Sequence, residues 1–170
     1  SYYGYLYSHT YDSDNSVNQI YRTDANGSVS TITLNGLSYE AKITSLSNGS
    51  YAATWISSDL TVYNQIFDSS GDAISTPTIV LEDVFNNYHN FNVLSSLSIQ
   101  SEGSSGFVIA VLHKEGSNQH QYYYRYTNAG VATGSGSFQS VGSYLTGKHL
   151  DLGNDSTIFF GKTRSGVGFL

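Results

Sequence analysis

The sequence predicts an all-β fold built from repeated antiparallel sheets. Apolar and polar residues alternate over short segments, and turns rich in glycine and asparagine separate these segments. A unit of roughly 50 residues also recurs along the chain. The composition agrees with this class, because 15 Tyr and 8 Phe accompany only 12% charged residues, and aromatic residues favour strands.

The clearest hairpins lie in residues 46–71, LSNGSYAATWISSDLTVYNQIFDSSG. Asn48-Gly49 predicts a type I′ turn, with positive φ at both residues, leading into a strand over 50–57. A second strand is expected over 61–68. The turn that follows it leads into a strand over 73–80, so this part of the chain predicts one antiparallel sheet.

The rest of the chain follows the same scheme. The segment 106–113, GFVIAVLH, is apolar on both faces and predicts a strand buried inside the body. Further strands are expected at 1–8, 17–23, 28–34, 39–46, 93–100, 121–127, 136–141, 148–152, 156–162 and 167–170. Polar loops are expected at 9–16, 82–92, 114–120 and 141–148.

Overlaying the units predicts a β-propeller-like array of about four four-stranded antiparallel units, of which the first and last are incomplete. We place them at approximately 1-36, 37-83, 93-142 and 147-170 of a single domain. Their third strands, NQIYRTDANG, NQIFDSSG and YYYRYTNAG, share an aromatic residue, a charged residue and a glycine-containing turn. A two-sheet β-sandwich whose hairpins are merely similar is the alternative fold.

The pattern L-x-x-G-x-Y-x-x-x-W, then Y-x-Q-x-F-D-x-x-G, resembles the propeller-like repeats of large secreted bacterial calcium-dependent adhesins. The match is close in residues 46–71 only, and it is carried by Leu46, Gly49, Tyr51, Trp55, Tyr63, Gln65, Phe67, Asp68 and Gly71. The resemblance implies an extracellular, surface-exposed adhesion module, and it transfers no catalytic residue.

Composition and charge exclude several classes of function. The chain has no cysteine, which excludes thiolate metal sites and cysteine nucleophiles. A net charge of −6 with 7 Lys plus Arg disfavours binding to nucleic acid or anionic membranes, and no apolar run approaches the roughly 18–20 residues that span a bilayer. The absence of an initiator Met and of a signal peptide predicts a processed chain or a domain of a larger parent protein.

The long loops are expected to gather on one face of the scaffold, where β proteins carry function. Phe85, Tyr88, His89 and Phe91, separated by asparagines, predict a surface that binds carbohydrate or peptide. His113 and His120 lie in or beside loops of the same face and complete the predicted ligand-binding set. Packing of the aromatic rings beneath their loop is the alternative.

Two metal ions are candidates for the same face. Asp12, Asp14 and Asn15 offer alternating oxygen ligands of the kind that calcium takes, and Asp68 with Asp72 could do the same. Such residues also serve as turn formers through their own backbone hydrogen bonds. Zinc is the second candidate, because His9, His89, His113, His120 and His149 all lie in or beside the loops, although no H-x-H or H-E-x-x-H spacing is present.

The sequence therefore predicts a non-catalytic extracellular or cell-surface module for adhesion or binding. It contains no G-x-S-x-G, P-loop or Rossmann fingerprint. One alternative is a structural subunit that assembles with another chain through open strands at its ends. A glycoside hydrolase, whose carboxylate pair would come from distant loops, is the other.

Overall fold

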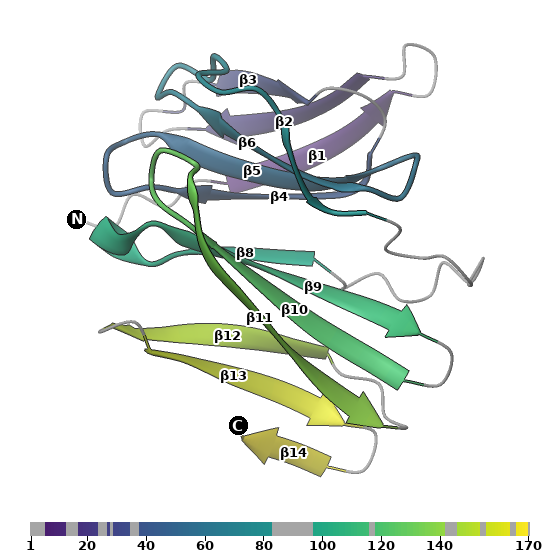
Figure 1. Cartoon of the computed structure of the whole chain (residues 1–170). Helices are drawn as coiled ribbons and strands as arrows, with labels where there is room; N and C mark the ends of the chain where they lie inside the picture. Colours follow the sequence, from purple (N-terminus) through teal and green to yellow (C-terminus); the bar gives the residue numbers. More distant parts are fainter. Residues whose placement is uncertain are drawn as a thin grey trace.

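Antiparallel strands make up most of the described chain in the computed structural model (Figure 1). The structure describes residues 6–12, 17–23, 27, 29–34, 38–82, 97–115, 118–141, 146–153, 156–163 and 166–169. Side chains are described for 19–21, 27, 29–34, 41–82, 97–111 and 121–137.

The strands form four sheets, and each sheet takes its strands in chain order as a simple meander. The first sheet holds β1 (Leu6–Asp12), β2 (Val17–Thr23) and β3 (Val29–Leu34). The second holds β4 (Ser38–Ser45), β5 (Tyr51–Ser57), β6 (Val62–Phe67) and β7 (Thr78–Leu81). The third holds β8 (Leu97–Ser101), β9 (Phe107–Glu115), β10 (Asn118–Tyr126) and β11 (Ala132–Val141), with a short 3-10 turn, Gly103–Ser105, between β8 and β9. The fourth holds β12 (Thr146–Gly153), β13 (Ser156–Thr163) and β14 (Gly166–Phe169).

The sheets stand in a row in the order in which the chain forms them (Figure 1). The first and fourth sheets lie at opposite ends of this row, and each has three described strands. The predicted all-β class and the repeated antiparallel sheets are confirmed.

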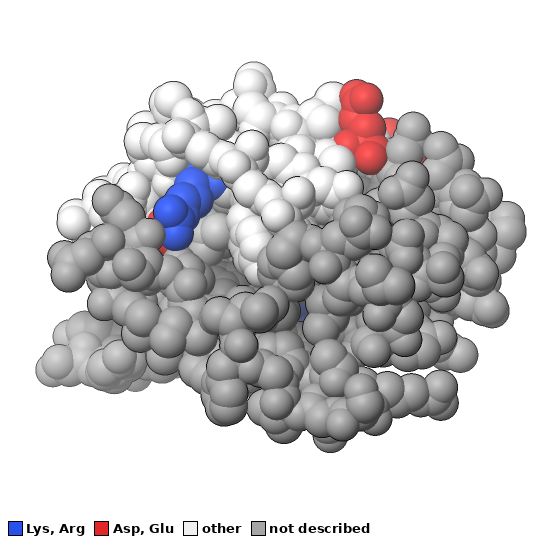
Figure 2. Space-filling model, turned by 60° about the horizontal axis from the view of Figure 1, so that its bottom comes forward, with Lys and Arg blue, Asp and Glu red and all other residues white. Residues whose placement is uncertain are grey.

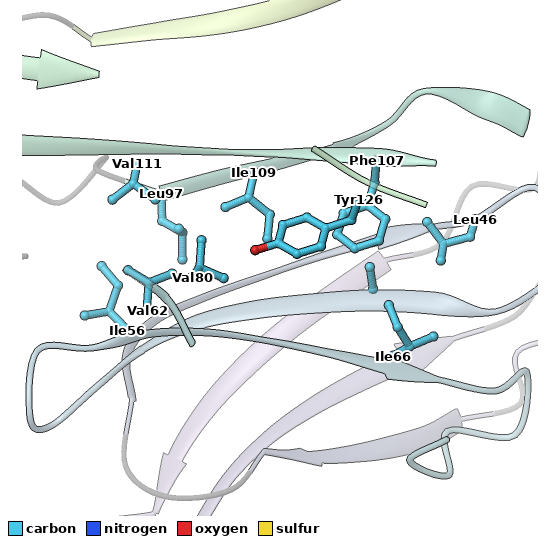
Figure 3. Close-up of a cluster of buried hydrophobic side chains, with 11 residues drawn as sticks. Leu46, Ile56, Val62, Ile66, Val80, Leu97, Phe107, Ile109, Val111 and Tyr126 are labelled. Carbon is cyan, nitrogen blue, oxygen red and sulfur yellow. The ribbon is translucent and has the colours of Figure 1, made fainter. Parts of the chain in front are cut away.

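The second sheet is covered on both faces. Every residue of β5 is buried, and alternate residues belong to different clusters because side chains alternate across a strand. The cluster between the first and second sheets contains Ile20, Ile32, Leu34, Tyr51, Ala53, Trp55 and Phe67. The cluster between the second and third sheets contains Leu46, Ala52, Ile56, Val62, Ile66, Val80, Leu97, Phe107, Ile109, Val111 and Tyr126 (Figure 3).

Strand β9 was expected to be buried on both faces, and its described side chains, from Phe107 to Val111, are at most 2% exposed. Phe107 also pairs with Tyr126 of β10, and their rings stack with centroids 5.2 Å apart. The described part of this apolar run therefore forms a strand that is buried on both faces, as its composition predicts.

The hairpin turn between β4 and β5 differs from the predicted type I′. Leu46 N donates to Ser50 O at 2.9 Å and Gly49 N donates to Leu46 O at 3.0 Å, while only Gly49 has a positive φ, of 84°. This is a type I turn followed by a glycine bulge. The reason lies in Asn48, whose Oδ1 accepts from Ser50 N at 3.1 Å and from Ser50 Oγ at 2.6 Å.

Three of the predicted polar loops are shorter than expected. His9 lies inside β1, Lys114 and His120 lie inside β9 and β10, and Lys148 lies inside β12. The prediction was wrong here because it required apolar alternation, whereas the backbone ladder continues through polar residues at strand ends.

The turn between the third and fourth strands of a sheet rests on the preceding sheet. Gly130, between β10 and β11, is so close to the second sheet that an added Cβ would lie 3.0 Å from Ile66 Cγ1. An added Cβ at Gly71, between β6 and β7, would likewise lie 3.2 Å from the carbonyl oxygen of Thr31 in the first sheet. Both turns therefore need a residue without a side chain.

We expect Gly130→Ala to destabilise the protein more than Gly49→Ala does. Both glycines have positive φ, 79° and 84°, so both variants suffer a backbone cost of about 1–2 kcal/mol. Only Gly130 also meets a neighbouring side chain, whereas nothing lies within 4 Å of an added Cβ at Gly49. Urea unfolding of both variants measures the difference, and equal losses would show that the turn does not rest on Ile66.

Candidate functional site

The longest connection, residues 82–96 between β7 and β8, lies at one end of the array. In Figure 1, β1, β7, β9 and β11 end on the same side, at Asp12, Leu81, Glu115 and Val141. We call this side the loop end. The connections β4–β5, β6–β7, β8–β9 and β10–β11 lie at the other side (Figure 1). The predicted sorting of long loops to one side and short turns to the other is wrong in part. Two residues, 116–117, join β9 to β10 at the loop end, whereas ten residues, 68–77, join β6 to β7 at the other side.

The structure places some of the predicted site residues at the loop end. Asp12 is the last residue of β1, opposite Val17. His113 and His120 lie on β9 and β10 and are direct register partners. The remaining predicted residues, Asp14, Asn15, Phe85, Tyr88, His89 and Phe91, lie outside the described residues.

A row of tyrosines leads from the core toward the loop end. Tyr126, Tyr124 and Tyr122 alternate along the face of β10 that packs against the second sheet. Tyr126 is 6% exposed, whereas Tyr124 and Tyr122 are half-buried. Burial raises the pKa of Tyr126 and of Tyr124. The neighbouring tyrosine adds a smaller increase, Tyr124 to the pKa of Tyr126 and Tyr122 to the pKa of Tyr124. The row therefore passes from a core residue to rings that are partly open to solvent.

The opposite face of β10 carries Tyr123 and Arg125. Burial raises the pKa of Tyr123, and Arg125 Nε lies 3.4 Å from Glu102 Oε1. Charged side chains are otherwise sparse on the described surface seen in Figure 2.

Two acidic residues in tight turns are engaged by the backbone. Asp68 Oδ1 accepts from the backbone nitrogens of Ser70, Gly71 and Asp72 at 2.8, 3.0 and 3.0 Å. This arrangement caps the β6–β7 turn and favours the turn-forming role of Asp68 over the calcium-binding one. No group of three or more metal-ligating side chains occurs among the described residues.

Asp59 holds the β5–β6 turn in a similar way. Its Oδ1 accepts from the hydroxyl of Ser57 and, at 3.2 Å, from the backbone nitrogen of Thr61. These hydrogen bonds, that of Ser57 above all, lower the pKa of Asp59 below its usual 3.8. In this turn Leu60 has a φ of 66° and is the one described non-glycine residue with positive φ.

Sequence reasoning missed two features. Asn64 lies on the β6 face toward the third sheet, is 1% exposed, and its Oδ1 has no hydrogen-bond partner among the described residues. Nothing in the sequence marks Asn64 as buried. The pairing of His113 with His120 did have a signal, because the two residues are spaced symmetrically about Gly116-Ser117.

Comparisons with known proteins identify no relative. No family model, no curated protein and no solved structure matches the chain. None of the described residues belongs to a helix that is long and apolar enough to cross a membrane.

We expect acid to weaken the wild-type protein more than an Asp59→Asn variant. Because the pKa of Asp59 is lowered on folding, its carboxylate adds stability above about pH 3.8 and loses it as the pH falls through the folded pKa. The effect is small, since Asp59 is exposed. Melting temperatures between about pH 6 and pH 2 measure it, and parallel curves for the two proteins would contradict the assignment.

Proposed function

We propose that this chain is a non-catalytic binding module of the β-propeller type, which recognises a carbohydrate or a peptide through its loop end. The observation that carries the proposal is the longest connection of the chain, residues 82–96, which joins β7 to β8 at that end (Figure 1). It contains Phe85, Tyr88, His89 and Phe91. Aromatic rings interleaved with asparagine amides suit sugar rings with their hydroxyls, and also peptides.

The propeller assignment is supported by the way in which the second and third sheets approach each other. They come close along their first strands, where β4 and β8 have Cα atoms within 8 Å of one another, compared with about 10 Å between ordinary packed sheets. Close first strands with wider spacing farther out are typical of propeller blades. Four meanders in chain order add further support.

The packed sheets give the proposed site a rigid base. Val111, Phe107 and Ile109 are fully buried, and β9 and β10 pair without a break in register from Phe107 to Glu115. Rigid strands can hold contact residues at their ends in place before a ligand arrives, which lowers the entropic cost of binding. Tyr122 and Tyr124 of β10 add two partly buried aromatic rings between the core and the same end.

Three parts of the proposal come from the sequence alone. The location is extracellular or at the cell surface, in line with the resemblance to secreted adhesins and with a polar surface of Ser, Thr, Asn and Gly. Calcium bound by Asp12, Asp14 and Asn15 stays a prediction. The proposal assigns no catalytic residue, and hydrolysis of glycosides is its least favoured alternative.

A structural subunit is the second candidate function, and β11 favours it. This strand is an edge of the third sheet, spans ten residues from Ala132 to Val141 and contains no charge. Its described side chains, 132–137, are all exposed. Long uncharged edges invite a strand from another chain, so assembly would proceed through β11 in addition to the end strands suggested by the sequence.

We expect a Tyr88→Ala/Phe91→Ala double variant to lose ligand capture while its melting temperature changes by no more than about 1–2 °C. Screening on glycan and peptide arrays, followed by calorimetry on any hit, provides the measurement. An Ile74→Ala/Val131→Ala variant is the matched control, because it removes two apolar side chains that are 60% and 61% exposed, near the tight turns. A large loss of stability in the first variant would assign its rings to packing instead.

For the second candidate, we expect Thr133→Lys/Ser135→Lys to abolish self-association, because charges on an edge strand oppose strand addition. Both positions are exposed, so the monomer should keep its melting temperature. Analytical ultracentrifugation over a wide concentration range compares the variant with the wild type. A wild-type protein that is monomeric throughout would remove the candidate.

A further inference from the structure

We propose that His113 and His120 form a two-histidine site for a divalent transition-metal ion such as Zn²⁺, Co²⁺, Ni²⁺ or Cu²⁺. The two residues are Cα partners across β9 and β10. They lie close to the loop end of the third sheet, two residues before Glu115 and two after Asn118. Imidazole is a ligand that suits all four ions.

The register that pairs the histidines is set by the core. From Phe107↔Tyr126 to Glu115↔Asn118, β9 and β10 pair without a shift. A slip by one residue would move Phe107, Ile109 and Val111 out of the cluster that they form with the second sheet. Packing therefore fixes which residue stands opposite His113.

The spacing suits chelation. Residues directly opposite each other on antiparallel strands have Cβ atoms about 4.5–5.5 Å apart and belong to the same face of the sheet. Zinc–nitrogen bonds of about 2.0–2.1 Å in a tetrahedral site place two ligand nitrogens roughly 3.3 Å apart. Two imidazoles carried at opposite register positions can meet that requirement without a change in the backbone.

The two histidines extend rows of residues that the core positions. His113 and His120 continue the rows of β9 and β10 that contain Val111 and Tyr122, one step nearer to the loop end. On the side away from β9, Gln139 of β11 is the register partner of His120, so an amide-bearing residue belongs to the same row.

The other histidines on described strands lack such a partner. His9 of β1 stands opposite Ile20, and His149 of β12 stands opposite Phe159. Both are single histidines on β-strands, so they provide matched controls. The inference does not depend on the proposed carbohydrate or peptide ligand, because it uses β9 and β10 alone.

The test is calorimetric titration of the full chain with ZnCl₂, repeated with CoCl₂ while the visible absorption of bound cobalt is followed. We expect one ion per chain for the wild type and for His9→Ala and His149→Ala. His113→Ala and His120→Ala should each weaken binding at least tenfold. Zinc at ten times its Kd should raise the melting temperature of the wild type by roughly 3–6 °C.

A His113→Cys variant guards against misfolding of the alanine variants. It keeps two ligands at the paired positions, so it should bind zinc where His113→Ala does not, and its cobalt complex should show a thiolate absorption band. The proposal is overturned if the wild type binds neither ion. It is also overturned if binding survives in both His113→Ala and His120→Ala, or is lost in the His9 or His149 variants.

Discussion

Burial of the second sheet on both faces is the constraint on which the rest of the structure depends. Trp55 and Ile56 are neighbours in β5, each is 1% exposed, and they belong to opposite clusters. A sheet with two apolar faces cannot be stable in water by itself, because each buried side chain of this size contributes about 1.5–3 kcal/mol only when it is covered. The first and third sheets supply the two covers. Their alignment with the second sheet brings the strand ends, and so the candidate site, to one side.

Much of the fold could be predicted from the sequence because its signals are local. Asn-Gly and Ser-Ser-Gly turns, period-two alternation and an apolar run mark strands without reference to the rest of the chain. The turn between β4 and β5 was predicted in the right place but with the wrong geometry, since the choice between turn types depends on a side-chain hydrogen bond of Asn48. The choice between a closed ring, an arc and a sandwich depends on how sheets stack, which no local pattern encodes.

The candidate site was predictable only in outline. A meander sends alternate connections to the same end, so the location of the loop end follows from strand order alone. The partner of His113 was missed because residues 114–120 are polar and give no alternation that marks them as strand, so the symmetric spacing of His113 and His120 about Gly116-Ser117 was not recognised as a hairpin. The buried amide of Asn64 was missed for the opposite reason. It occurs in a strand whose pattern, with Val62 and Ile66 on the same face, only makes sense once the third sheet is in place.

The contacts of Gly71 and Gly130 give the row of sheets a direction. Each glycine touches the sheet that precedes it in the chain, Gly71 at Thr31 and Gly130 at Ile66. During synthesis from the amino end, the surface against which each of these turns packs is therefore made before the turn itself. This contact does not depend on any later segment of the chain. Growth by one meander at a time, from the amino end onward, is the assembly order that such a chain favours.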